Sequence, residues 1–149
     1  MAVTRAQVET MLVRRRGKLM SAAGLAVSVS GANADLIDPI GYAIRRLGGS
    51  VASIIAITDT DIATVSADDL DGLLDISELR LLQNIKGNLD VVDITTGPIS
   101  EKLSQLSDSL QEDIKTLTAK VEDEYGVGGT ELEAGVLKMN FAEHNEDIA

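Results

Sequence analysis

The sequence predicts an all-α protein, namely a small helical bundle with one long amphipathic helix and an extended C-terminal tail. Of its 149 residues, 44% are hydrophobic but only 2% are aromatic, so aliphatic side chains must fill the core, as is typical of helical domains. Apolar residues also recur at helical spacing between recognisable capping signals. Residues 98–125 carry one apolar stripe on an otherwise polar segment. We expect a helical domain over residues 1–125 and a flexible acidic tail over 126–149.

The first predicted helix begins after Thr4. Thr4 and Gln7 have the spacing of a capping box, in which the side chain of each residue accepts a hydrogen bond from the backbone N–H of the other. Apolar residues then repeat every three or four positions until Gly24, where the helix should end. Residues 25–34 alternate briefly and then turn, which predicts a turn-rich connector or a short hairpin arm.

The second predicted helix is short. Asp38 is expected to cap it and Pro39 to take its first position, where a missing N–H costs nothing. Gly48 and Gly49 should close it. The apolar run at residues 51–57 is too short to identify by its period, so it predicts either a buried extended segment or a helical turn.

The third predicted helix should form the centre of the core. Thr58 and Asp61 cap a short turn before it, and Ser66 with Asp69 caps the helix itself, which is expected to run over residues 67–86. Gly87 and the asparagine after it should end this helix, with residues 89–96 as a linker. Its apolar residues leave only a narrow polar strip, which indicates contacts on several sides. They are Leu70, Leu73, Leu74, Ile76, Leu79, Leu81, Leu82 and Ile85.

The long helix predicted over residues 98–125 has an apolar stripe with an eleven-residue period. Such a period drifts little around a helix, so the stripe stays nearly straight over roughly 40 Å. Two interpretations are open: the stripe covers the protein's own core, or part of it forms a seam with another subunit. The stripe residues are Ile99, Leu103, Leu106, Leu110, Ile114, Leu117 and Val121, followed by Tyr125.

Charge is unevenly distributed along the chain. The net charge is −11, of which residues 1–50 contribute +4 and residues 51–149 contribute −15. The basic group at Arg14, Arg15, Arg16 and Lys18 suits an acidic partner or phosphate, but the interpretation we favour is that it complements a helix dipole and faces solvent. The acidic remainder resists adhesion to nucleic acid. Scarce aromatics also argue against a protein that stacks single-stranded bases.

The tail contains one segment with a different pattern. Residues 136–141 alternate between apolar and polar side chains, as a strand with one buried face does. Such a segment can pair with the sheet edge of a partner, although it can also fold back or stay disordered. The glycines at 126–129 would serve as a hinge before it. The candidate partner-binding residues here are Val136, Leu137, Met139 and Phe141.

Catalytic and metal chemistry find little support in the sequence. The single histidine, His144, is the sixth residue counted back from Ala149 and lies among polar neighbours, and the chain has no cysteine. The glycines at 126–129 lack the Lys-Ser/Thr of a phosphate-binding loop. The acids from Asp68 to Asp75 fail the spacing of a calcium loop and suit capping instead. We expect no enzyme activity, no cofactor, and no membrane span, since no apolar run approaches 18 residues.

Three stretches of the sequence carry a resemblance to a known family. They read RRRGKLMSAAGL, NADLIDPIGYAIRRLGG and DLDGLLDISELRLLQNIKGNLDVVDITTGPISEKLSQL. In this order they resemble the adaptor or head-completion proteins of the tailed-bacteriophage head-to-tail connector, over about residues 3–125. The resemblance implies a virion structural protein, assembled in the host cytoplasm, that forms a ring of usually twelve copies beneath the portal. It implies no active-site residues.

The same resemblance implies a set of partners. These are the portal protein, neighbouring copies of the chain, and a downstream neck or tail-terminator protein, while DNA passes through without specific binding. The alternative class is a phage assembly chaperone or small acidic helical binding module that clasps a partner helix by its stripe. A third class, a nucleic-acid binder using Arg14 to Lys18, conflicts with the acidic remainder.

Overall fold

The computed structural model describes residues 2–93 and 100–126, with their side chains except those of 89–93 and 100–107. The described chain is helical and contains no strand, which confirms the predicted all-α class. Its helices and two short 3₁₀ turns follow in the order α1 (Arg5–Ala22), η1 (Ala34–Leu36), α2 (Ile37–Arg46), α3 (Asp59–Ala63), η2 (Ala67–Asp69), α4 (Leu70–Asp93) and α5 (Ser100–Tyr125).

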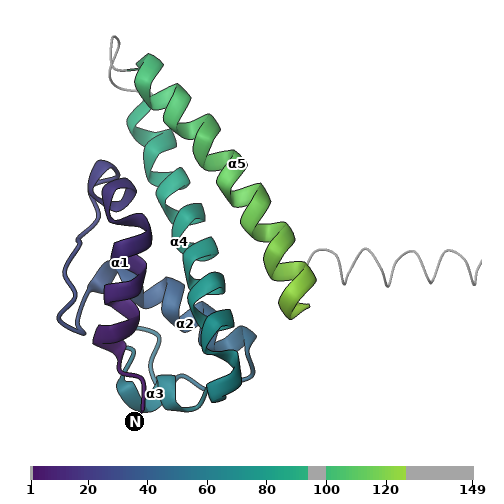
Figure 1. Ribbon diagram of the computed structural model, residues 1–149. Helices are drawn as coiled ribbons and strands as arrows, with labels where there is room; N and C mark the ends of the chain where they lie inside the picture. The colour runs from purple at the N-terminus through teal and green to yellow at the C-terminus, as the bar shows by residue number, and fades with distance from the viewer. Residues whose placement is uncertain (1, 94–99, 127–149) are drawn as a thin grey trace, which may run out of the picture.

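Helix α4 is the centre of the bundle, as its wide apolar coverage predicts. It packs against α2, α5 and α1, and Figure 1 shows it between α1 on one side and α5 on the other. α4 and α5 run side by side in opposite directions as a long hairpin (Figure 1). The core is almost entirely aliphatic, and its fully buried α4 members are Leu73, Ile76, Leu81, Leu82 and Ile85.

The predicted starts of α1 and α3 are confirmed in detail. Thr4 and Gln7 form a complete capping box at α1, and Thr58 with Asp61 forms another at α3. α1 ends as predicted at Gly24, which adopts φ +76°. A glycine reaches this left-handed region without the steric penalty that a Cβ atom causes, so it can reverse the chain at the helix end.

The prediction that the central helix ends at Gly87 is wrong. α4 continues through Gly87 and Asn88 to Asp93, so residues 89–93 are helix rather than linker. Gly87 is exposed and keeps a helical backbone. A glycine in an exposed helix position costs only about 1 kcal/mol relative to alanine, which is too little to stop a helix whose earlier turns are buried against α2 and α5.

The prediction that Asp38 caps α2 is also wrong. The 3₁₀ turn η1 precedes α2, and no side chain caps the start of α2 itself. The Asp38 carboxylate instead accepts hydrogen bonds from Arg80 (2.9 Å) and Asn84 (2.9 Å) of α4. Arg80 and Arg46 also lie over the ring of Tyr42, with 4.9 Å and 5.1 Å to its centroid. These contacts fasten α2 to α4, and a partner on another helix therefore outcompetes a local cap.

The apolar run at residues 51–57 is neither a buried strand nor a helical turn. It is an irregular loop in which Ile54 is 85% and Ile55 77% exposed, while Ile57 is 3% exposed. Backbone N–H groups of the loop donate to Asp61 Oδ1 and Thr64 Oγ1 at 3.1 and 3.0 Å. These bonds hold its backbone while two apolar side chains stay outside. Residues 25–33 likewise form an irregular connector rather than a hairpin arm.

A buried polar cluster, which sequence patterns do not predict, joins these two loops to α1. The Arg5 guanidinium donates to the carboxylate of Glu9 (2.9 Å) and to the carbonyls of Ile57 (2.8 Å) and Asn33 (2.7 Å). Glu9 is fully buried and accepts backbone N–H groups from Asn33 and Gly31. Each buried charge therefore has a counter-charge and further hydrogen bonds, which is the condition under which buried charge is tolerated.

Candidate interaction surfaces

The described part of the α5 stripe faces the protein's own core. Leu110 and Val121 are each 1% exposed, and Ile114 and Leu117 are half-buried against the same core cluster. Ile99 lies outside the described residues, as do the side chains of Leu103 and Leu106. For the described half of the stripe, packing within the chain therefore accounts for the apolar period, and a subunit seam can draw only on what remains exposed.

Two members of the basic group of α1 form ion pairs within the chain, so the interpretation that favoured helix dipole and solvent is wrong for Arg15 and Arg16. The Arg15 guanidinium donates to Asp75 (2.9 Å) and Glu78 (2.8 Å) of α4. Arg16 donates to Glu78 (2.7 Å) and to Asp113 of α5 (3.0 Å). The last turn of α1 contains no basic residue. Because both guanidiniums are engaged by carboxylates, they bind α1 to the α4–α5 hairpin rather than presenting free donors to phosphate.

Asp75 is the most connected carboxylate of this surface. Besides Arg15, it receives Lys120 Nζ (3.1 Å) and the hydroxyl of Tyr125 (3.0 Å) from α5. Burial works against ionisation of Asp75, but the three donors outweigh burial and lower its pKa below the ordinary 3.8. Burial, and then the bond to Asp75, raises the pKa of the Tyr125 hydroxyl. Both shifts favour the observed state, in which a carboxylate accepts from a neutral phenol.

Asp75 therefore has a different role from the capping predicted for the acids between Asp68 and Asp75. Asp68 and Asp69 do lie in the 3₁₀ turn η2, where the Ser66 side chain accepts from the Asp68 N–H. Within the described ranges, no group of three or more His, Asp or Glu side chains is arranged to hold a metal ion. Asp75 itself serves in ion pairs with Arg15 and Lys120.

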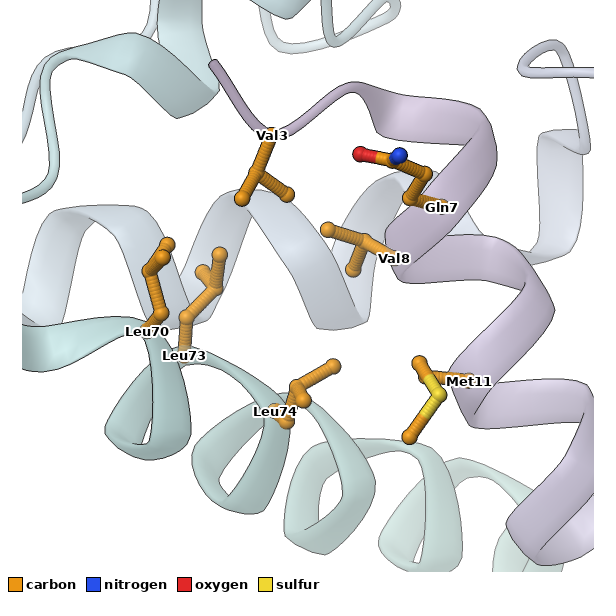
Figure 2. A pocket seen from close by; sticks show the side chains of 7 residues that line it. All are labelled: Val3, Gln7, Val8, Met11, Leu70, Leu73 and Leu74. Atoms are coloured by element: carbon orange, nitrogen blue, oxygen red, sulfur yellow. The ribbon is translucent and has the colours of Figure 1, made fainter. Parts of the chain in front are cut away.

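An apolar groove lies between the beginning of α1 and the first half of α4. Figure 2 shows the side chains from the two elements pointing toward one another across an open space. The space measures about 260 Å³. Gln7 is the one polar side chain in its lining, and Met11 is 38% exposed at the surface. The lining residues are Val3, Gln7, Val8, Met11, Leu70, Leu73 and Leu74. We call this the α1–α4 groove.

Two further hollows with apolar side chains in their lining lie on the described surface. One of about 250 Å³ adjoins the α1–α4 groove through Val3 and Leu70 and continues toward Ile62 and Val65. The other, of about 320 Å³, lies between α4 and α5, where Ile114 forms its floor among lysine and glutamine side chains. The half-buried Ile114 is thus a stripe residue that remains accessible from outside.

Sequence patterns place the groove residues on apolar helix faces but do not show that the groove is open. Val8 and Met11 have the spacing of ordinary core positions, and the space beside them is seen only once α1 is packed on α4. Ile54 and Ile55 were predicted within a segment that is buried or helical, and no local signal marks their exposure. The tail residues Val136, Leu137, Met139 and Phe141, and His144 after them, lie outside the described residues.

Comparisons of the chain with protein-family models, with curated proteins and with solved structures found no match. The resemblance to connector proteins is therefore still a prediction. None of the helices in the described ranges has the combined length and hydropathy needed to cross a bilayer. The features of the described surface that suit binding are its apolar hollows and its exposed isoleucines, and they lie on a helical domain that contains several ion pairs.

Proposed function

We propose that the chain is a structural virion protein of the phage head-to-tail connector. Copies would form a ring beneath the portal, join the capsid to the tail and extend the DNA channel. The observation that carries the proposal is the pair of isoleucines on the loop at 51–57, exposed by 85% and 77%. Adjacent large apolar side chains held in water by a hydrogen-bonded loop are typical of a surface that another protein covers.

A ring needs contacts of a particular kind. Copies related by rotation in a closed ring meet through two different patches, so each subunit presents one surface to one neighbour and another surface to the next. The isoleucine loop supplies one such patch. The first part of the stripe predicted from the sequence, with Ile99, Leu103 and Leu106, is the proposed seam, because Leu110 and Val121 are already used by the core.

The tail and the charge distribution support the remaining parts of the proposal. Val136, Leu137, Met139 and Phe141 are the proposed portal-docking residues, and many tethered copies in one ring would make a stable attachment from individually weak ones. A net charge of −15 over residues 51–149 gives a surface past which DNA can move without binding. The ring would then contact a downstream neck or tail-terminator protein on its other side.

The test combines the protein with a phage portal protein and images the mixture by negative-stain electron microscopy. A ring stacked on the portal is the expected result. A small one-to-one complex would indicate an assembly chaperone instead of a connector. Failure to bind any phage structural protein would overturn the proposed virion role. Salt-sensitive DNA affinity of the isolated chain would favour a nucleic-acid binder instead.

The loop is tested by a matched pair of variants. Ile54→Asp places a charge on the exposed patch and should abolish ring assembly without changing the folded helical content, because the side chain touches little of its own chain. Thr60→Asp adds the same charge at an exposed position of α3 and should assemble normally. Normal assembly of the Ile54 variant would remove the loop from the subunit contact.

A further inference from the structure

The α1–α4 groove is an apolar surface that the described chain leaves open. Val8 and Leu73 form its floor, and Met11 stands at its rim (Figure 2). Its volume of about 260 Å³ exceeds what a few methyl groups fill, and its lining offers a ligand no charged side chain. An occupant must therefore present apolar side chains and satisfy its own polar groups elsewhere.

The end of α5 lies close to this groove. The Tyr125 ring packs on Gly72, where an added Cβ would lie 3.2 Å from two ring carbons, and its hydroxyl donates to Asp75. Gly72 immediately precedes Leu73 of the groove, so α5 ends against the opposite side of the same helix. The distance that the chain must cover from there is about one helix diameter, roughly 10–12 Å.

The chain beyond α5 is long enough and carries suitable side chains. Ten residues, 126–135, precede Val136, and ten extended residues reach as far as about 33 Å. Residues 136–141 then bring Leu137, Met139 and Phe141 to one face if extended. Phe141 is the only phenylalanine of the chain, and an unbranched methionine adapts readily to an irregular apolar space.

We propose that residues 136–141 occupy the α1–α4 groove of their own chain in the free protein. Met139 and Phe141 enter between Met11 and Leu74, and Lys138 and Asn140 remain in solvent. This inference goes beyond the connector role and does not depend on it, since it concerns the isolated chain. If both hold, the segment leaves the groove before it docks on a portal, so one apolar surface protects the other until the partner arrives.

Disulfide trapping tests the proposal in the full-length chain, and the absence of native cysteine removes background. The double variant Met11→Cys with Met139→Cys should form an intramolecular disulfide under mild oxidation, at least tenfold faster than Lys115→Cys with Met139→Cys. Lys115 is exposed on α5 and serves as the control. Equal rates for the two pairs would overturn the proposal. Disulfides that join two chains would assign the groove to a second copy instead.

A second measurement keeps the proposal falsifiable if the cysteine pair perturbs folding. The methyl resonances of Leu73 and Leu74, followed by NMR, should shift when Phe141→Asp expels the segment. Asn140→Asp adds the same charge on the face that points to solvent and should leave them unchanged. Identical spectra for the wild type and the Phe141 variant would show that the segment does not contact the groove.

Discussion

The buried pair of Arg5 and Glu9 provides the sharpest test of how this fold is held together. Arg5 is 5% exposed, and its guanidinium makes three hydrogen bonds. Two join α1 to the carbonyls of Asn33 and Ile57, and the third pairs Arg5 with the Glu9 carboxylate on the same helix. Arg5→Met retains a long unbranched side chain and removes all the donors. The change therefore isolates the polar contribution from the loss of packing.

The expected cost follows from what the substitution leaves behind. Glu9 is 0% exposed and keeps backbone donors from Gly31 and Asn33, but it loses the guanidinium that pairs with it. Removing one partner of a buried ion pair costs about 3–5 kcal/mol, because the remaining charge is still desolvated. A domain of this size is stable by about 5–15 kcal/mol in total, so the variant should be marginally folded.

Urea unfolding followed by circular dichroism measures this cost. Arg14→Met is the matched control, since Arg14 is exposed on the same helix, and it should change the free energy of unfolding by less than about 0.5 kcal/mol. Arg5→Lys should fall between the two because an ammonium cannot reproduce the fork of donors. A free energy of unfolding for Arg5→Met within about 1 kcal/mol of wild type would refute the reasoning from buried charge.

Three further predictions follow from single positions. Leu110→Ala should destabilise the monomer by about 2–5 kcal/mol in urea unfolding, whereas Gln111→Ala beside it should change stability by less than about 0.5 kcal/mol; equal effects would mean that the stripe is not core. Because the pKa of Asp75 is lowered from 3.8, its stabilisation is present above that value and is lost as pH falls through the folded-state pKa, so the stability gap between wild type and Asp75→Asn should narrow in that range when unfolding is measured from pH 7 to pH 2. Gly24→Ala should destabilise by about 1–2 kcal/mol because of its positive φ, while Gly87→Ala in the exposed helix should stabilise by about 0.5–1 kcal/mol; thermal melts showing the same sign for both would contradict the backbone argument.

Local chemistry allowed much of this fold to be predicted. The capping boxes at Thr4 and Thr58 and the helix end at Gly24 each depend on residues a few positions apart, so the sequence carries the whole signal. The dominant apolar character of α4 likewise identifies the centre of the core. These features require no knowledge of which helices become neighbours.

What could not be predicted depends on contacts between distant segments. From the sequence, Asp38 has the position of a helix cap, but in the structure it pairs with Arg80 of α4. Arg15 likewise has a position that suits the helix dipole, but it pairs with Asp75. Gly87 resembles a stop, but α4 continues through it because the earlier turns of α4 pack against α2 and α5. In each case a tertiary partner overrides a preference of about 1 kcal/mol or less.

The candidate surfaces were the least predictable part. The apolar run that contains Ile54 is indistinguishable from a core segment, since composition does not reveal which side chains the loop turns outward. The α1–α4 groove depends on how two helices pack together, which the spacing of residues within either helix does not reveal. The stripe of α5, by contrast, was fully visible, and its described half proved to face inward.

The attachment of the last turn of α5 has a mechanical consequence. A pulling force applied beyond residue 126 would reach Tyr125 first, and its hydroxyl is anchored on the Asp75 carboxylate. Because α4 and α5 are antiparallel, a load applied between this end of α5 and the start of α4 peels the hairpin open one turn at a time instead of shearing all its contacts together. The Tyr125 contact therefore bears the load before the buried Val121 and the Lys120–Asp75 ion pair behind it.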